Sequence, residues 1–197
     1  MTTIVDYGAG NLRSVQNTLE KLNAPYEVTN NPQTVRGASK IILPGVGHFG
    51  QMMHAIDELG LRESLVERIH SGTPFLGICI GLQCLFENSE EAPGSAGLGI
   101  FSGSVKRFAG PGRIPHMGWN SLAATRESRL LKGLPELAFT YFANSYYAPV
   151  NGATAAVCSY MQTFSAVLES KNVYAVQFHP EKSGPIGLRV MENFLNL

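Results

Sequence analysis

The first half of the chain alternates short apolar runs with amphipathic stretches. Compact apolar runs, typical of buried strands, occur at residues 3–5, 26–28, 40–43 and 74–78. Apolar residues recur at helical spacing over 12–22 and again over 51–70, where Gly60 interrupts the pattern. Apolar strands that alternate with helices predict a mainly parallel sheet with helices on both faces.

From Gly99 onward the pattern changes, and short β-rich runs follow one another closely. The stretch 100–108 alternates apolar and polar residues, and glycine and proline then break the chain at 110–115. Further β-rich runs occur at 139–147, 154–160, 164–169 and 173–178. These runs predict hairpins that extend the same sheet in antiparallel fashion.

The chain is expected to close with a helix that begins at Ser183-Gly184-Pro185. The inward face of this helix should carry Ile186, Val190, Phe194 and Leu197. The sequence shows no internal repeat, linker or low-complexity segment, and 197 residues suffice for one well-buried core. We therefore predict a single domain over residues 1–197.

Composition narrows the class of protein. Hydrophobic residues make up 44% and charged residues 15%, as in an ordinary globular chain. The formal net charge is +0 and no lysine/arginine block occurs, so we expect neither nucleic acid nor an anionic membrane as main partner. No apolar run is long enough to span a membrane, and the N-terminus has no basic segment. The cysteine count of 3 favours a reducing, cytoplasmic setting over a disulfide framework.

A candidate nucleophile lies in Gly77-Ile78-Cys79-Ile80-Gly81-Leu82-Gln83, where an apolar run meets a helix-like run. A cysteine flanked by glycines at such a junction is the sulfur version of the strand-turn-helix nucleophile elbow. We expect a strained backbone at Cys79, little room for side chains at the glycines, and a helix N-terminus that favours a thiolate. A cysteine that ends an apolar strand is also common as an inert core residue, so this motif alone leaves both interpretations open.

A second strand end, Gln177-Phe178-His179-Pro180-Glu181, supplies what a cysteine nucleophile needs. Such a nucleophile requires a base, and the base requires a group that orients it. Alternation along a strand would put His179 and Glu181 on the same side. Glu181 could then hold the imidazole of His179 while the ring faces Cys79.

With these two motifs the chain resembles the class I (triad) glutamine amidotransferases. Further stretches resemble, within that family, the glutaminase subunits of imidazole glycerol phosphate synthases: Asp6 to Leu12, Leu43 to Gly50 and Pro115 to Asn120. The resemblance runs from residue 4 to the C-terminus. It implies a flavodoxin-like, three-layer α/β fold and glutamine hydrolysis by Cys79, His179 and Glu181, with no cofactor and no metal.

The glycine-rich loop after residues 40–43 has several possible roles. Its glycines can expose backbone N–H groups beside the elbow, at the carboxyl ends of the strands. It could be a plain strand-to-helix turn, and the absence of Gly-Lys-Ser/Thr argues against a nucleotide phosphate loop. The resemblance favours an oxyanion hole made by Val46 or Gly47 together with Ile80, in a loop that changes conformation when the partner binds its own substrate.

The resemblance also implies substrate-binding residues. Gly45, Gln83, Ser145 and Tyr146 match positions that hold the amino-acid end of glutamine, although a helix-surface glutamine is the ordinary interpretation of Gln83 alone. Many relatives carry histidine where this chain has Asn144, so no side-chain role is predicted there.

A partner subunit is implied as well: a separate cyclase with a (β/α)8-barrel fold, in a heterodimer. It would use the ammonia to make imidazole glycerol phosphate and aminoimidazole carboxamide ribotide in histidine biosynthesis. The residues expected near that interface are Asn11, His116, Met117, Trp119, Asn120 and Lys182. The alternatives are a structural loop for 115–120 and a solvated side chain for Lys182.

The remaining histidines and cysteines are interpreted as structural. His48, His54 and His70 are expected at the surface or in packing, although His48 could line the site. Cys84 and Cys158 are expected in the core, and no Cys-x-x-Cys or His-x-x-x-His pair indicates zinc.

Three other functions remain open at this point. The chain could be the amidotransferase subunit of another pathway, or a stand-alone cysteine hydrolase of γ-glutamyl substrates. A non-catalytic binding subunit is the third possibility, but it would be expected to have lost one of the three catalytic residues.

Overall fold

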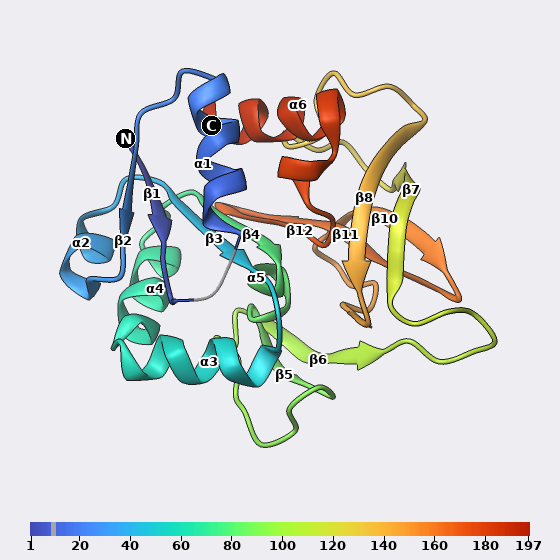
Figure 1. Ribbon diagram of the computed structural model, residues 1–197, viewed down its shortest axis with the longest axis horizontal. Coiled ribbons are helices and arrows are strands. Elements are labelled where there is room, and N and C mark those ends of the chain that lie inside the picture. Colours follow the sequence, from blue (N-terminus) through green and yellow to red (C-terminus); the bar gives the residue numbers. More distant parts are fainter. Residues whose placement is uncertain (9–10) are drawn as a thin grey trace.

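The computed structural model describes residues 1–8 and 11–197 (Figure 1). Ala9 and Gly10, in the predicted loop after the first strand, lie outside the described residues. A nine-stranded sheet in the order β2-β1-β3-β4-β12-β11-β10-β7-β8 runs through the chain. Its parallel part contains β1 (Thr2–Val5), β2 (Tyr26–Thr29), β3 (Ile41–Gly45), β4 (Phe75–Cys79) and β12 (Val173–Val176).

Every residue of β1, β3, β4 and β12 is buried, because helices cover both faces of this part of the sheet. This double cover explains why these strands are continuous apolar runs in the sequence. Figure 1 shows α1 and α6 on one face, with α3 and α4 on the other. The helices are α1 (Leu12–Lys21), α2 (Pro32–Gly37), α3 (Phe49–Glu58), α4 (Leu61–His70), α5 (Ile80–Gln83) and α6 (Gly184–Leu195), with a 3-10 turn η1 (Pro180–Lys182).

The antiparallel extension of the sheet is confirmed. Beyond β12 come β11 (Gln162–Ser170), β10 (Thr154–Tyr160), β7 (His116–Ala124) and β8 (Ala138–Asn144), each antiparallel to its neighbour. The sequence pattern did not predict β7. Only His116 and Leu122 of this strand are buried, so its apolar alternation is weak.

A separate three-stranded sheet corrects two predictions. It contains β5 (Phe86–Ser89), β6 (Phe101–Arg107) and β9 (Tyr146–Tyr147), so the stretch 100–108 does not join the main sheet. The helix after the elbow is also shorter than its apolar pattern suggests, because Phe86 already belongs to a strand. The Leu85 carbonyl accepts the N–H groups of Ile100 and Phe101, and this pairing overrides the local helical pattern.

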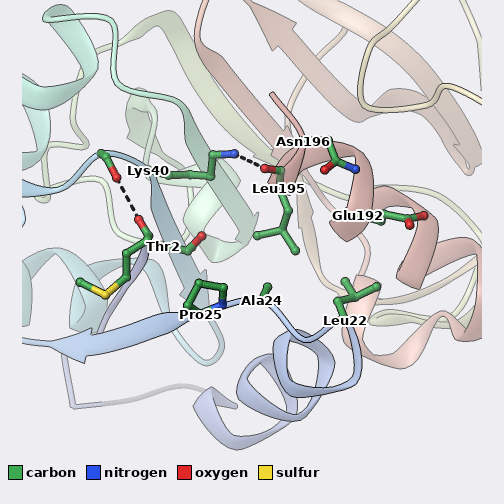
Figure 2. A pocket seen from close by; sticks show the side chains of 10 residues that line it. Thr2, Leu22, Ala24, Pro25, Lys40, Glu192, Leu195 and Asn196 are labelled. Carbon is green, nitrogen blue, oxygen red and sulfur yellow. Dashed lines mark hydrogen bonds between the residues drawn. The ribbon is translucent and has the colours of Figure 1, made fainter.

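The C-terminal helix α6 is anchored to the start of β3 by a half-buried lysine, Lys40. The Lys40 ammonium donates to the carbonyl oxygens of Phe194 and Leu195 in the last turn of the helix, and Figure 2 shows the bond to Leu195. Burial lowers the pKa of Lys40. The inward face of α6 is formed by Gly187, Val190, Met191 and Phe194, whereas the predicted Ile186 and Leu197 are half-buried.

Candidate active site

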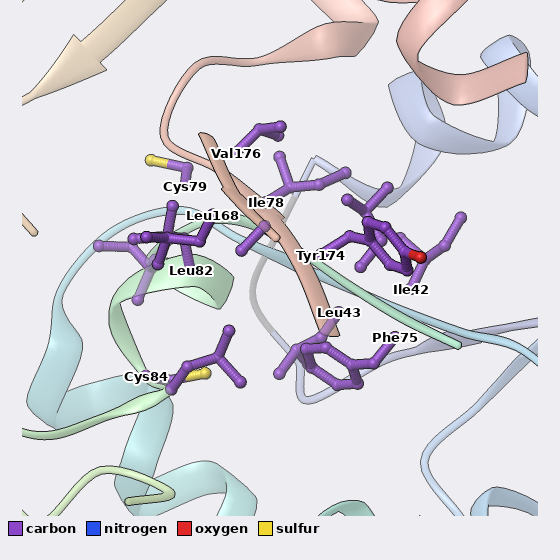
Figure 3. Close-up of a cluster of buried hydrophobic side chains, with 14 of the residues drawn as sticks. Ile42, Leu43, Phe75, Ile78, Cys79, Leu82, Cys84, Leu168, Tyr174 and Val176 are labelled. Atoms are coloured by element: carbon purple, nitrogen blue, oxygen red, sulfur yellow. The ribbon is translucent and has the colours of Figure 1, made fainter. Parts of the chain in front are cut away.

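The candidate nucleophile ends β4 in a strained turn. Cys79 is 3% exposed and has φ 56° and ψ −107°, a positive φ that non-glycine residues rarely adopt. Figure 3 shows it at the edge of a buried apolar cluster, with the sulfur directed away from the neighbouring side chains. The flanking glycines are required by close packing: a Cβ on Gly77 would lie 2.2 Å from the Gly81 oxygen, and one on Gly81 would lie 2.0 Å from the Leu43 oxygen.

The candidate base and its orienting carboxylate lie together beside this turn. Nδ1 of His179 is 2.8 Å from Oε1 of Glu181, and both side chains are almost fully buried. The predicted strand geometry for this pair is wrong, because β12 ends at Val176 and Glu181 lies in the 3-10 turn. The tight turn after His179, not strand alternation, brings the carboxylate back to the imidazole. The backbone N–H of His179 donates to the Tyr141 carbonyl at 2.9 Å, which fixes the turn against β8.

The surroundings of His179 favour its charged form. Burial lowers the pKa of this imidazole, but hydrogen bonds to Cys79 and Glu181 and their negative charges outweigh burial and raise the pKa to about 10. His179 is therefore an imidazolium at neutral pH, next to a sulfur and a carboxylate. This arrangement can hold a cysteine thiolate and can deliver a proton to a leaving group.

The loop after β3 lies over the elbow, and one residue that the sequence analysis missed fixes it. The Tyr7 hydroxyl accepts the backbone N–H of Val46 at 3.2 Å and lies 3.5 Å from the Val46 oxygen. Burial raises the pKa of Tyr7 to about 12, although the bond with Val46 lowers it, so the hydroxyl stays neutral. In this conformation Val46 would have to release Tyr7 before its N–H could bind an oxyanion. The position of Tyr7 in the Asp6 to Leu12 motif was the available signal.

Two further features of this loop concern its glycines. Gly47 has φ +94°, which a residue with a side chain would adopt only with strain. A Cβ on Gly45 would lie 2.7 Å from the Gly81 nitrogen and 2.8 Å from the Ile80 Cβ. Gly45 therefore lets the loop approach the elbow helix closely.

A cavity of about 360 Å³ opens over the sulfur. It brings together most of the predicted catalytic, oxyanion and substrate-binding residues. Its lining consists of Val46, Gly47, Cys79, Ile80, Gln83, Glu91, Pro115, Ala143, Asn144, Ser145, Tyr146, His179 and Lys182. Glu91 and Lys182 supply one carboxylate and one ammonium group, the charges that complement a zwitterionic amino acid. Glu91 lies in no motif and was not predicted from the sequence; one of its oxygens accepts the Phe49 N–H at 2.7 Å.

Amide groups line one side of the cavity. Gln83 is 1% exposed, so it is not an ordinary helix-surface glutamine. Its Nε2 donates to the Tyr146 carbonyl and to Oε1 of Gln177, each at 3.1 Å. Asn144, for which no side-chain role was predicted, is also buried and donates to the same Tyr146 carbonyl at 2.9 Å.

Among the predicted interface residues, Met117 and Trp119 lie on the surface and are 65% and 57% exposed. Trp119 is the register partner of Tyr141 on β8, and their rings meet edge to face. The exposed Lys182 ammonium lies 5.9 Å from the centre of the Tyr141 ring. Met117, Trp119 and Lys182 are exposed and Tyr141 is half-buried, and we name the surface formed by these four residues the β7–β8 patch.

The structure does not place all the predicted interface side chains on the surface. His116 is 3% exposed and stacks between Phe142 and Tyr160, and this burial lowers its pKa to about 4. The His116 side chain therefore lies in the aromatic core of this region, below the surface. Asn120 donates to the Ser159 carbonyl and lies 3.3 Å from Nε2 of the same histidine. Asn11 is half-buried at the start of α1, where its oxygen accepts the Ser14 hydroxyl.

The other thiols and histidines are structural, as predicted. Cys84 and Cys158 are buried, and burial raises the pKa of each to about 12. His48 caps α3, and His54 pairs with Glu58 at the surface. Within residues 1–8 and 11–197, no group of three or more His, Cys, Asp and Glu side chains could hold a metal ion. In the same part of the chain, no helix combines the length and the apolar character that a membrane span requires.

The fold and the site together define a class I glutamine amidotransferase. The family model described as "Glutamine amidotransferase class-I" matches residues 3–197, so the chain belongs to this family. It is 46% identical over 198 residues to the imidazole glycerol phosphate synthase subunit HisH of Methanothermobacter thermautotrophicus, covering 100% of this chain and 98% of that protein. The subunit HisH of Thermococcus kodakarensis is 46% identical over 203 residues, with 100% of both chains covered.

Solved structures confirm the predicted fold. A crystal structure described as a glutamine amidotransferase superposes with a TM-score of 0.77 at 20% identity, covering 98% of this chain and 97% of that chain. PurLQS from Thermotoga maritima contains a chain with a TM-score of 0.74 at 19% identity, covering 99% and 97% respectively. At these identities the likeness concerns the fold alone.

Proposed function

We propose that this chain is the glutaminase subunit of an imidazole glycerol phosphate synthase in histidine biosynthesis. It would hydrolyse glutamine to glutamate and ammonia and pass the ammonia to a separate cyclase chain. The identity to the HisH subunits over the whole chain supports this function. The observation that carries it is the buried group of Cys79, His179 and Glu181, of which Cys79 and His179 line a cavity.

The first half of the reaction is acylation. The Cys79 thiolate attacks the side-chain amide carbon of glutamine, and the carbonyl π electrons move onto oxygen. The N–H of Ile80, with that of Gly47 or a released Val46, stabilises the oxyanion, which is worth a factor of roughly 100 to 1000. As the tetrahedral intermediate collapses, the C–N bond breaks and His179 protonates the leaving ammonia. A γ-glutamyl thioester remains on the sulfur.

The second half is deacylation. Neutral His179 takes a proton from a water molecule while the oxygen of that water attacks the thioester carbon. The C–S bond then breaks, glutamate leaves, and the imidazolium–thiolate pair is restored. Glu181 holds the ring of His179 through both halves and stabilises its charged form. Gly45, Gln83, Ser145 and Tyr146 are proposed to bind the amino-acid end of glutamine.

The partner is proposed to be a cyclase with a (β/α)8-barrel fold in a cytoplasmic heterodimer. Ammonia is mostly protonated at neutral pH and is then a poor nucleophile, so an enclosed route to the partner makes chemical sense. The exposed β7–β8 patch beside the cavity supports docking there, with Asn11 and Asn120 as further candidates. The proposed extent of the single domain, 1–197, is supported by one sheet that includes strands from residue 2 to 176.

The test is glutamate release from glutamine, measured for the chain alone and with the cyclase chain and its ribotide ligand. We expect release that depends on the liganded cyclase and disappears in Cys79→Ala. Equal release with and without the cyclase would mean a stand-alone hydrolase. Release that survives Cys79→Ala would mean that another residue is the nucleophile.

A further inference from the structure

One fully buried side chain beside the sulfur has no role in the mechanism above. Gln177 is 0% exposed and directly follows β12, whose Val176 pairs with Ile78 of β4. Cys79 directly follows Ile78, so the parallel register carries Gln177 to the side of the nucleophile. A buried amide has to satisfy both of its polar ends, and each end of Gln177 contacts a residue of the site.

The nitrogen end of Gln177 donates to the nucleophile, and its oxygen end accepts from the cavity wall. Nε2 of Gln177 is 3.7 Å from the Cys79 sulfur. Its Oε1 accepts Nε2 of Gln83 at 3.1 Å, and the same Gln83 nitrogen donates to the Tyr146 carbonyl. The result is one chain of amides from the Tyr146 backbone to the sulfur.

The orientation of the Gln83 and Gln177 carboxamides follows from the Tyr146 carbonyl, where this row of hydrogen-bonded amides ends. A backbone carbonyl can only accept, so the Gln83 group facing Tyr146 has to be the nitrogen. The Gln177 group facing that nitrogen then has to be the oxygen, which leaves the Gln177 nitrogen for the sulfur. If Gln177 were turned over, two N–H donors would face each other and the sulfur would lose its donor.

Two buried acceptors at the cavity have no hydrogen-bond partner among residues 1–8 and 11–197. One is Oε1 of Gln83, a residue that lines the cavity. Oδ1 of Asn144 is in the same state, because its nitrogen is also held by the Tyr146 carbonyl. Buried acceptors without a donor cost free energy, and a bound molecule with N–H groups relieves that cost.

We propose that Gln177 is a positioning residue for glutamine hydrolysis, with one end on the Cys79 sulfur and the other holding Gln83. Its N–H donates to the thiolate, and its oxygen turns the free oxygen of Gln83 toward an N–H donor of the substrate. This role rests on the proposed glutaminase function. It links the reactivity of the nucleophile to substrate binding through a single side chain.

Several titratable groups surround the sulfur. His179 is hydrogen-bonded to Cys79, and Glu181 acts on the sulfur through that ring. Tyr7 lies close enough to interact with Cys79, and Glu91 and Lys182 line the cavity. Gln177 carries no charge, so replacing it removes a donor and leaves these groups in place.

The first experiment measures the sulfur. Alkylation of Cys79 by iodoacetamide is followed against pH by peptide mass spectrometry, in the complex with the cyclase chain. Gln177→Met has a similar volume but no amide, and we expect alkylation at neutral pH to slow roughly tenfold and its profile to move to higher pH. Gln51→Met should leave the profile unchanged, since Gln51 is exposed on α3.

The second experiment measures substrate binding by a double-mutant cycle. Gln177→Met and Gln83→Met should each raise KM for glutamine about tenfold. Because Gln177 acts on KM through Gln83, Gln177→Met should have little further effect on KM in the Gln83→Met background. If Gln177→Met raised KM only through a structural defect, its effect on KM would instead add to that of Gln83→Met.

The outcomes separate this proposal from the proposed function. A wild-type complex without glutamate release would contradict the glutaminase function itself. An active wild type with an unchanged Cys79 profile in Gln177→Met, or with additive KM effects, would overturn only the role of Gln177. If Gln177→Met does not fold, the side-chain amide signals of Gln177 can be followed by NMR in the wild-type chain. They should titrate with Cys79, and signals that do not move would also overturn the proposal.

Discussion

At the residue scale, the site depends on a buried charge that its neighbours stabilise. An imidazole as buried as that of His179 would ordinarily be neutral, because burial disfavours the charged form. Its hydrogen bonds to Cys79 on one side and Glu181 on the other reverse this preference. The proton that ammonia needs is therefore already in place before glutamine binds.

The dependence on pH follows from the raised pKa of His179. As pH rises through about 10, the imidazolium is lost, so kcat/KM for glutamine should fall on the alkaline side. Glu181→Gln removes one of the causes that raise this pKa, so the alkaline fall should begin at lower pH. The wild type and Glu181→Gln, each in complex with the cyclase chain, are compared by kcat/KM from neutral pH upward. Glu58→Gln, which removes the same charge from the exposed His54–Glu58 pair, should keep the wild-type profile.

The same pKa predicts how stability changes with pH. A histidine whose pKa is raised on folding stabilises the fold fully below its unfolded value of about 6.5. This contribution is lost as pH rises through about 10. The free energy of unfolding should therefore decline at alkaline pH, and this decline should begin at lower pH in Glu181→Gln. An unchanged decline in Glu181→Gln would contradict the assignment of Glu181 as the group that stabilises the imidazolium.

At the element scale, the elbow depends on backbones that touch. The helix α5 lies so close to β3 and β4 that Gly77 and Gly81 have no space for a Cβ. The positive φ of Cys79 is held by this packing, since a short helix of four residues could not hold it alone. The glycines therefore act on the nucleophile through the position of its backbone.

Substitution of one of these glycines should unfold or loosen the elbow. In Gly81→Ala the new Cβ would lie 2.0 Å from the Leu43 oxygen, which is backbone and cannot turn away. We expect a loss of about 1–3 kcal/mol in the free energy of unfolding, measured by chemical denaturation, together with loss of glutaminase activity. Gly152→Ala, where no described residue has an atom within 4 Å of the new Cβ, should change neither. Wild-type stability in Gly81→Ala would show that the elbow can relax.

The elements also show how far the sequence alone reaches. The parallel strands and the helices α1, α3 and α4 could be predicted, because burial on two faces or one stripe leaves a clear period in the apolar residues. The strands β5 and β7 could not: the first is selected by backbone pairing with a later segment, and the second has few buried positions. The helix α2 is only 6 residues long and depends on the Asn31 cap.

The candidate site was predictable where motifs carry it and unpredictable where tertiary contacts do. Cys79, His179 and Glu181 stand in recognisable local patterns, although the 3-10 turn that joins the last two leaves no periodic signal. The contact of Tyr7 with Val46 joins residues 39 positions apart, and that of Gln83 with Gln177 joins residues 94 apart. Spacing along the chain does not reveal such pairs.

At the scale of the whole molecule, the sheet order places the active site and the exposed patch near each other. The strands β4 and β12 lie at the centre of the sheet and meet at the cavity, whereas β8 is the edge strand. His179 is bonded to the backbone of Tyr141 on that edge strand, and the Tyr141 side chain belongs to the β7–β8 patch. A partner that covers this patch would therefore contact Tyr141, whose backbone is bonded to the proposed catalytic base His179.

Trp119 offers the sharpest test of this arrangement. It is 57% exposed in a patch with another aromatic ring and a lysine, and a partner that buries such a tryptophan often gains much of its affinity from it. In Trp119→Ala we expect Kd for the cyclase chain, measured by titration calorimetry, to rise by roughly thirtyfold, a loss of about 2 kcal/mol. Val28→Ala is the matched control, because Val28 is 38% exposed on β2, the opposite edge of the same sheet. Its Kd should stay at the wild-type value. Equal losses in both variants would indicate a general loss of stability, and unchanged affinity in Trp119→Ala would move the docking surface away from β7 and β8.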